Sequence, residues 1–379
     1  MKRKVLCIAL CVCLLAGMRV QAADLSLEAP SAVLMDAATG TILYEQNAHE
    51  RLAPASVTKV MTLLLVMEAL DSGKISWDDP VIASDFAASK GGSQVYLEPG
   101  EQMSMDEMLK SVVVSSANDC ATALAEHVAG SEAAFVELMN AKAQDLGMTD
   151  THFVNCTGLD DEPEAKEHLT TAYDIALMSR ALLSHDAIRN YTTIWMDTVR
   201  DGKFGLSNTN KLVRFYDGTT GLKTGFTSGA GYCLSASAMR DGLELIAVVM
   251  HCESSAGRFS SAKALLDYGF ANYALVTPAL EPQEIPVRLG TEASICPVPQ
   301  TLTPVLVDKA VRADVRQEVE LLPEVTAPVT AGQQLGTLRI YGGSTLLATI
   351  PLCAPEAVER LHLWDLTKRI LDGLCFGTA

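Results

Sequence analysis

Residues 54–70 of the 379-residue chain read PASVTKVMTLLLVMEAL, a short polar start followed by a long apolar run. This pattern predicts a helix with Ser56 and Lys59 on one face of its first turn, because residues three apart are neighbours on a helix surface. The first turn also has free backbone N–H groups and the positive end of the helix dipole, which stabilise an oxyanion. A serine hydroxyl beside a lysine amine at such a place is a candidate activated nucleophile.

The Ser-x-x-Lys spacing is not specific by itself, since the chain contains it a second time at Ser260 and Lys263. Ser260 falls well inside a helix predicted over 257–270, and no further catalytic motif follows it. The first copy is therefore the better candidate, and its interpretation depends on whether suitable partner residues follow.

The elements around residues 54–70 predict an α+β fold. Apolar runs at 31–36 and 41–45 predict a hairpin, and three further strands are predicted over 222–227, 231–239 and 243–252, the last two joined by an Asp-Gly turn. Other helices are predicted over 105–114, 120–129 and 132–146. Residues 168–171 lead into a further helix that ends at Leu183, with Thr170 or Thr171 as its cap and His168 as a structural histidine. Because strands joined by hairpins are antiparallel, we expect an antiparallel sheet with helices packed on it.

The α+β elements predict a catalytic domain over residues 23–276, and the segments on both sides of it differ from it in composition. Residues 1–22 read as a secretory signal peptide with a basic start, an apolar segment and a small-residue cleavage site; the alternative is an uncleaved membrane anchor. Residues 277–353 are proline-rich with short β-like runs and predict a small all-β domain. Residues 354–379 predict an amphipathic helix that either contacts a membrane surface or packs on its own domain. The signal peptide predicts an extracytoplasmic location.

Charge and cysteine content exclude several classes of function. The net charge is −17, and a signal with four basic and no acidic side chains leaves −21, which disfavours a nucleic-acid partner. Seven of the ten cysteines follow the signal, and they are scattered without a C-x-x-C pair. This argues against a zinc site or a disulfide framework. A single disulfide between two of the seven cysteines is the alternative that the sequence leaves. We expect no metal and no cofactor.

Three short motifs follow one another in the chain: Ser56-Val57-Thr58-Lys59, Ser116-Ala117-Asn118 and Lys223-Thr224-Gly225. In isolation, Ser116 and Asn118 are either helix caps or residues of a loop that faces the active site. The ordered set is typical of penicillin-binding proteins and class A β-lactamases. Over residues 25–270 the chain resembles the D-alanyl-D-alanine carboxypeptidases, the low-molecular-mass penicillin-binding proteins of bacterial cell-wall maturation. The resemblance implies a β-lactamase/transpeptidase-like domain with a helical subdomain, followed by the small all-β domain.

The resemblance also implies roles for the first two motifs. Ser56 would attack the carbonyl of the penultimate D-alanine, and a neutral Lys59 would take its proton. Burial and the positive charge of Lys223 would both favour the neutral amine. Ser116 would relay the proton to the departing D-alanine, and Asn118 would bind the substrate amide or hold Lys59.

The third motif would bind the substrate and its developing charge. Lys223 and Thr224 would lie near the terminal carboxylate of the substrate, and Gly225 would let the substrate backbone approach the strand. The backbone N–H of Phe226 would complete the oxyanion hole with that of the nucleophile. Some relatives carry histidine at the position of Phe226, so the preference for substrate or pH is expected to differ. Arg258 would help to bind the carboxylate, unless it is an ordinary surface arginine.

The predicted function is thus a serine-type carboxypeptidase that removes the terminal D-alanine from peptidoglycan pentapeptides, with β-lactam antibiotics as acylating inhibitors. A β-lactamase is the alternative at the same site, but Glu162, Glu164 and Glu167 in the relevant loop show no convincing pattern for a water-activating glutamate. A non-catalytic wall-binding protein is the alternative of another class, and the intact motifs argue against it.

Overall fold

The computed structural model describes residues 25–161, 163–301, 304–362, 364 and 367. The predicted signal peptide, residues 1–22, and most of the predicted C-terminal helix lie outside this range. The described start of that last segment is extended: Val358 and Arg360 form isolated bridges with Val329 and Gly290. Within the described residues, no helix is both long and apolar enough to cross a membrane.

The centre of the first domain is a five-stranded antiparallel sheet with the order β2-β1-β9-β8-β7. The two predicted hairpins are confirmed, and β7, which carries the Lys-Thr-Gly motif, is an edge strand. The strand bounds are β1 Ser31–Asp36, β2 Ile42–Gln46, β7 Thr219–Thr227, β8 Gly231–Arg240 and β9 Leu243–Cys252.

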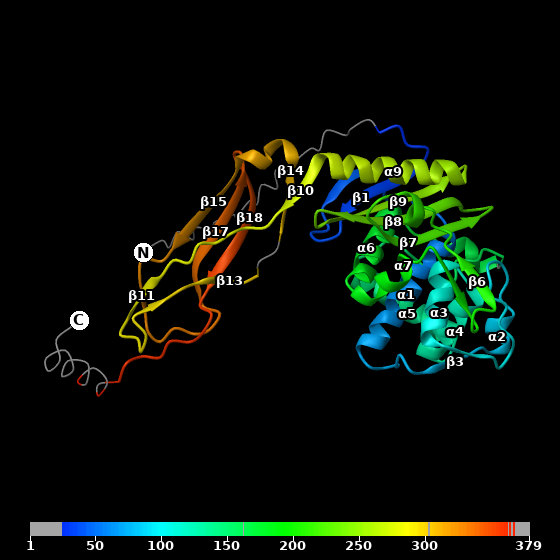
Figure 1. Ribbon diagram of the computed structural model, residues 1–379, viewed down its shortest axis with the longest axis horizontal. Helices are drawn as coiled ribbons and strands as arrows, with labels where there is room; N and C mark the ends of the chain where they lie inside the picture. Colours follow the sequence, from blue (N-terminus) through cyan, green and yellow to red (C-terminus); the bar gives the residue numbers. More distant parts are fainter. Residues whose placement is uncertain (1–24, 162, 302–303, 363, 365–366, 368–379) are drawn as a thin grey trace, which may run out of the picture.

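Helices cover both faces of this sheet, and Figure 1 shows α9 (Ser255–Asn272) on one face with α1 (Lys59–Asp71) and α6 (Ala172–Leu183) on the other. Each face has its own hydrophobic core. A strand covered on both faces reads as a continuous apolar run, which explains the sequence of β9 over residues 245–250. Thr171 caps α6 by accepting from the backbone N–H of Asp174, as predicted.

A helical subdomain lies below the sheet in Figure 1. Its main helices are α3 Met105–Val114, α4 Asn118–Ala129 and α5 Glu132–Asp145. Ser104 and Glu107 form a capping box that starts α3, and Ser131 caps α5. Smaller elements complete the domain: β3 Pro80–Ile82, α2 Asp85–Ala88, β4 Gln102–Ser104, η2 Pro163–Glu167, η3 Asp186–Ile188, α7 Arg189–Thr192, β5 Met196–Val199, β6 Phe204–Ser207 and α8 Leu212–Phe215.

The predicted single helix over 54–70 is wrong at its start. Residues Ala55–Thr58 form a 3₁₀ turn, η1, and the α-helix begins only at Lys59. Ala55 has φ +48°, a left-handed conformation that an α-helix does not contain. The oxygen of Ala55 accepts from the hydroxyl of Thr58 at 2.8 Å, so a side chain stabilises the tight turn.

The chain leaves α9 directly into a second, all-β domain, which confirms the predicted fold class. The connecting strand β10 (Tyr273–Val276) pairs with β14 (Val305–Asp308). The domain has two small hydrophobic cores of its own. Its other elements are β11 Ile285–Arg288, β12 Ser294–Ile295, β13 Val298–Pro299, η4 Lys309–Asp314, β15 Val315–Leu321, β16 Val325–Thr326, β17 Gln334–Gly342 and β18 Thr345–Cys353.

Candidate active site

The candidate nucleophile, Ser56, lies in the 3₁₀ turn, three residues before Lys59, where α1 begins. Ser56 is partly exposed, whereas Lys59, the first residue of α1, is completely buried. The Nζ atom of Lys59 lies 3.0 Å from the Oγ atom of Ser56. The two groups are therefore within reach of a direct proton transfer.

The environment of Lys59 favours the neutral amine. Burial lowers the pKa of Lys59 from 10.5 to about 7, against the opposing influence of Cys156 and Asp119. The amine also donates to the backbone oxygen of Thr157 at 2.8 Å, which fixes its direction. A lysine with such a pKa is in part unprotonated at neutral pH and can act as a base.

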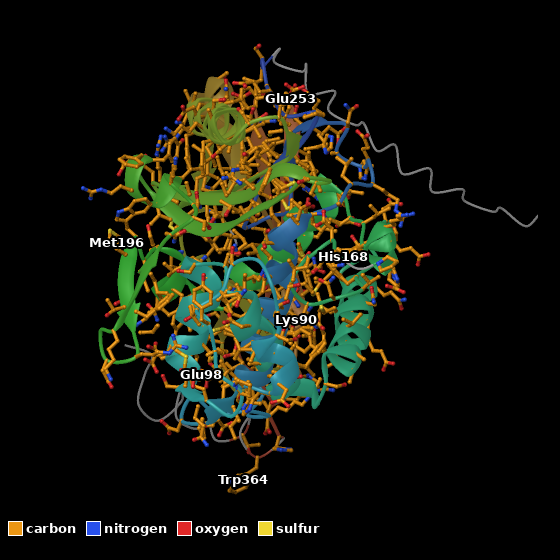
Figure 2. All side chains as sticks on the ribbon, turned by 90° about the vertical axis from the view of Figure 1, so that its right-hand side faces the viewer. Lys90, Glu98, His168, Met196, Glu253 and Trp364 are labelled. Atoms are coloured by element: carbon orange, nitrogen blue, oxygen red, sulfur yellow. The ribbon has the colours of Figure 1, made fainter. Side chains whose placement is uncertain are left out.

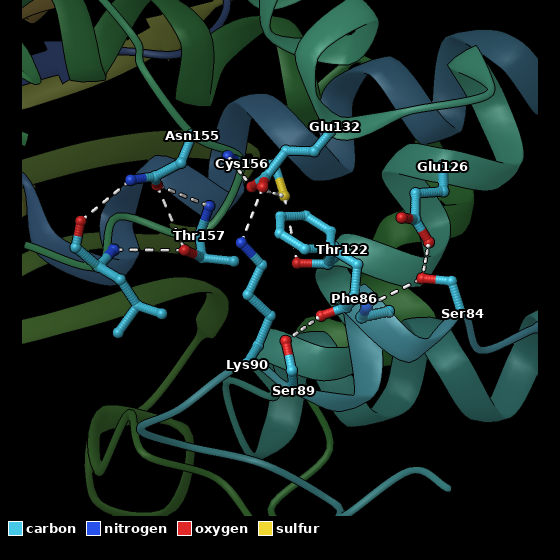
Figure 3. Close-up of polar contacts among 12 residues, drawn as sticks. Ser84, Phe86, Ser89, Lys90, Thr122, Glu126, Glu132, Asn155, Cys156 and Thr157 are labelled. Carbon is cyan, nitrogen blue, oxygen red and sulfur yellow. Dashed lines mark hydrogen bonds and ion pairs between the residues drawn. The ribbon is translucent and has the colours of Figure 1, made fainter. Parts of the chain in front are cut away.

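The carbonyl that orients Lys59 belongs to a tight turn over residues 155–159, drawn in Figure 3. The Oδ1 atom of Asn155 accepts from the backbone N–H groups of Thr157 and Gly158, at 3.1 and 2.7 Å. Gly158 has φ +81°, and a Cβ atom there would lie 1.8 Å from the oxygen of Ala55. Only glycine lets this turn pack against the nucleophile turn.

The Ser-x-Asn motif spans the short connection between α3 and α4, which contains Ser116, and the start of α4 at Asn118; neither side chain caps the helix. Ser116 is buried with φ +63°, and Asn118 is the first residue of α4, after Ala117 as the N-cap. The Nδ2 atom of Asn118 donates to the oxygen of Gly91 at 2.7 Å. Its Oδ1 atom is buried without a hydrogen-bond partner among the described residues, so an acceptor is left for a ligand N–H group.

The Lys-Thr-Gly strand passes directly beside the nucleophile turn. A Cβ atom at Gly225 would lie 2.6 Å from the oxygen of Pro54 and 3.0 Å from the backbone nitrogen of Ser56. Lys223 is buried and donates to the oxygen of Thr224 at 3.0 Å. Burial, and then the charges of Lys59 and Arg258, hold the pKa of Lys223 well below its usual value. Three basic side chains thus lie close together, and a bound carboxylate would favour the charged form of Lys223.

Thr209 is a site residue that the sequence analysis missed. The hydroxyl of Thr224 donates to the Oγ1 atom of Thr209 at 2.7 Å, so the Thr209 proton is the one left for a ligand. The backbone N–H of Thr209 donates to the oxygen of Val114, at the end of α3. The polar run Asn208-Thr209-Asn210 was a usable signal, but only the fold places it against β7.

Arg258 contacts the end of β7 at Gly225, the residue that precedes Phe226. Arg258 is only 6% exposed and donates to the oxygens of Gly225 and Cys233, at 3.1 and 3.3 Å. Its guanidinium thus holds the backbone of β7. Phe226 is 52% exposed and its ring stacks on that of Tyr232, with 4.3 Å between the ring centroids.

His168, labelled in Figure 2, contacts the nucleophile turn at Thr58. Its Nδ1 atom accepts from the backbone N–H of Val154 at 3.1 Å, so its Nε2 atom carries the proton and donates to the hydroxyl of Thr58 at 2.8 Å. That hydroxyl donates in turn to the oxygen of Ala55. Burial lowers the pKa of His168 to about 4, which keeps the ring neutral.

The remaining candidates of the sequence do not join this site. Ser260 lies in the second turn of α9 and donates to Glu28 at 3.0 Å. Glu164 and Glu167 are exposed on η2, and Glu162 lies outside the described residues. The six described cysteines are unpaired. No group of three potential metal ligands occurs in the part of the chain that the structure covers.

Comparison with known proteins gives consistent matches along the chain. The D-alanyl-D-alanine carboxypeptidase family matches residues 17–254, and the C-terminal domain of penicillin-binding protein 5 matches residues 277–360. The carboxypeptidase DacF of Bacillus subtilis is 41% identical over 355 residues, covering 92% of this chain and 90% of DacF. Among solved structures, penicillin-binding protein 5 from Haemophilus influenzae has a TM-score of 0.76 at 31% identity, covering 88% of this chain and 98% of the other. The cefotaxime-bound penicillin-binding protein D2 from Listeria monocytogenes has a TM-score of 0.60 at 34% identity, covering 65% and 99%.

Proposed function

Because the chain belongs to the D-alanyl-D-alanine carboxypeptidase family and is a hydrolase of that kind, we propose that Ser56 is its nucleophile and Lys59 its general base. The substrate is a peptidoglycan stem peptide that ends in D-Ala-D-Ala. The observation that carries the assignment is the 3.0 Å contact between the serine hydroxyl and a buried amine whose pKa is about 7.

The first half of the reaction forms an acyl-enzyme. The Oγ atom of Ser56 bonds to the carbonyl carbon of the penultimate D-alanine while the Oγ proton moves to Lys59. The developing oxyanion accepts from the backbone N–H groups of Ser56 and Phe226. The C–N bond then breaks, and the amine of the departing D-alanine takes a proton from Lys59 through the hydroxyl of Ser116.

The second half of the reaction releases the shortened peptide. A water molecule gives a proton to the neutral Lys59 and attacks the ester carbon, and the Oγ atom of Ser56 leaves and regains its proton. Both halves use the same base, so acylation and deacylation depend on the same unprotonated amine.

The terminal carboxylate of the substrate is the group that selects this site. Lys223 and the free proton of Thr209 face it, with Thr224 as the link between them. A carboxylate near Lys223 raises the pKa of the buried amine and restores its positive charge. Asn118 accepts a substrate N–H group through its unpartnered Oδ1 atom, and Arg258 keeps Gly225 in place.

β-Lactam antibiotics bind at the same nucleophile as acylating inhibitors. A β-lactamase would release them quickly, usually through a glutamate that holds a water molecule. The two described candidates, Glu164 and Glu167, are exposed on η2, and this favours the carboxypeptidase. Slow, stoichiometric release of nitrocefin is the expected behaviour, and rapid turnover would support the lactamase alternative.

The location and the domain boundaries are also part of the proposal. Residues 1–22 direct secretion, residues 23–276 form the catalytic domain and residues 277–353 form the all-β domain. Residues 354–379 contain the segment for which the alternatives are contact with the membrane and packing on its own domain, and Val358 and Arg360 at its start pair with the all-β domain. The pairing of β10 with β14 groups Tyr273–Val276 physically with the all-β domain. An enzyme with this arrangement acts on the outer face of the cytoplasmic membrane or in the cell wall.

The assignment is tested with two matched serine variants. Ser56→Ala is expected to abolish both labelling by a fluorescent penicillin and D-alanine release from a diacetyl-lysyl-D-alanyl-D-alanine peptide. Ser260→Ala, which alters the other Ser-x-x-Lys copy, is expected to keep both activities. Labelling that persists in Ser56→Ala would refute the assignment.

A further inference from the structure

One carboxylate behind the active site joins two separate segments of the chain. Glu132 is the first residue of α5, and its Oε1 atom accepts from both the backbone N–H and the thiol of Cys156, each at 3.1 Å. Its Oε2 atom lies 2.8 Å from the Nζ atom of Lys90. Figure 3 shows the carboxylate between these two partners. Glu132 touches none of the groups assigned to bind substrate.

Each partner of Glu132 directly precedes a carbonyl that orients a side chain of the site. Cys156 precedes Thr157, whose oxygen accepts from Lys59 at 2.8 Å. Lys90 precedes Gly91, whose oxygen accepts from the Nδ2 atom of Asn118 at 2.7 Å. The general base and the amide are thus both held by segments that meet at one carboxylate.

The contacts around Glu132 suit a rigid anchor rather than a solvated surface pair. The side chains of Lys90 and Glu132 are only 17% and 11% exposed. The Nζ atom of Lys90 also lies 3.9 Å from the centroid of the Phe86 ring. Burial would raise the pKa of Glu132, but the hydrogen bonds from Lys90 and Cys156 outweigh it and lower the pKa, so the carboxylate is charged at neutral pH. Charge-assisted hydrogen bonds of this kind are stronger and more directional than neutral ones.

We propose that Glu132 is a positioning residue that sets Lys59 through the turn over residues 155–159 and Asn118 through the segment over residues 89–93. The inference rests on the proposed function, because it assigns the two positioned groups to proton transfer and to substrate binding. The carboxylate has two separable sets of contacts, called arms here: the Cys156 arm through Oε1 and the Lys90 arm through Oε2. The Cys156 arm acts on the chemical step through Lys59, and the Lys90 arm acts on ligand binding through Asn118.

Three substitutions separate these arms. Lys90→Met removes one arm and leaves the Oε1 contacts with Cys156. Glu132→Gln keeps an oxygen for the N–H of Cys156 but turns an amide toward the Lys90 ammonium, so it also breaks mainly the Lys90 arm. Glu132→Ala removes both. The control is Lys142→Met, which breaks another partly buried ion pair on α5, with Glu68 at 2.9 Å, away from the site.

The measurement is the acylation of the full chain by a fluorescent penicillin at increasing concentrations, which yields a binding constant and a limiting acylation rate. Lys90→Met and Glu132→Gln are expected to weaken binding about tenfold, the effect of one lost hydrogen bond, with the limiting rate within about threefold of wild type. Glu132→Ala is expected to weaken binding similarly and to lower the limiting rate about 100-fold, as for a misplaced catalytic group. Lys142→Met should match wild type in both quantities.

Two results would overturn the inference. One is a folded Glu132→Ala protein, judged by near-UV circular dichroism, that keeps the wild-type limiting rate. The other is a uniform loss in Lys90→Met, Glu132→Gln and Lys142→Met that follows thermal stability alone. If Glu132→Ala does not fold, the test rests on Lys90→Met and Glu132→Gln. Weaker penicillin binding with a nearly unchanged limiting acylation rate in these two variants would support the inference, and wild-type binding in both would overturn it. Wild-type protein that takes up no penicillin at Ser56 would instead reject the proposed function itself.

Discussion

Lowering the pH is expected to weaken the first domain through His168, and the structure gives the magnitude. The ring accepts from Val154 and donates toward Thr58, so a second proton on Nδ1 would face the Val154 N–H group. The pKa of His168 is about 4 in the folded chain, against an ordinary 6.5. Each pKa unit corresponds to about 1.4 kcal/mol, so the difference is worth about 3 kcal/mol.

The sign follows from which state takes up the proton first. As the pH falls below about 6.5, the unfolded chain binds a proton at His168 while the folded chain does not, so the folded state loses stability. The loss grows until about pH 4 and stops there, since both states are then protonated. His152 also disfavours the charged ring, whereas Glu132 opposes this effect.

The assay compares wild type with His168→Gln by urea unfolding between pH 7.5 and pH 4. A glutamine amide has an oxygen for the Val154 N–H and a hydrogen for Thr58, but it does not titrate. The free energy of unfolding of wild type is expected to fall, relative to that of the variant, by about 3 kcal/mol across this range. Parallel curves for the two proteins would refute the reasoning, because the histidine would then titrate alike in both states.

Two further predictions concern the chemistry. Because burial lowers the pKa of Lys59 to about 7, the penicillin acylation rate should rise with pH as the ammonium loses its proton, with half of the maximum near pH 7; a flat profile from pH 5 to pH 9 would contradict this role. Gly225→Ala should lower acylation at least about 100-fold, because its Cβ would lie 2.6 Å from a backbone oxygen, whereas Gly205→Ala, with open space around the new atom, should react like wild type. Equal rates in these two variants would show that β7 does not need the close approach.

Much of the fold could be predicted from local patterns. Apolar runs on both sides of an Asp-Gly turn and of an Ala-Ala-Thr-Gly turn predicted the two hairpins. The helix over 105–114 has the predicted bounds, and its start is stabilised by a capping box formed within four consecutive residues. Thr171 was also a predictable cap. Such features depend on neighbours in the sequence, which is why they can be recognised without a structure.

The details of the site depend on contacts that no local pattern contains. The 3₁₀ turn at Ala55–Thr58 is stabilised by His168 and Gly158, about 100 residues further along the chain. Besides Ser56, Lys59 bonds to the backbone oxygen of Thr157, and a backbone oxygen is present in every residue, so no residue type marks it in the sequence. Thr209 accepts from the hydroxyl of Thr224, so its place beside the site is visible only once both segments are placed.

The passage from α9 into β10 without a loop determines where the chain can be cut. β10 leaves the catalytic domain but finds its partner in β14, so a fragment that stops at Val276 would keep a strand with no neighbour. An unpaired strand with apolar side chains promotes association between copies. A truncation at Asn272, the last residue of the helix, avoids the exposed edge and is the better end point for a minimal crystallisable enzyme.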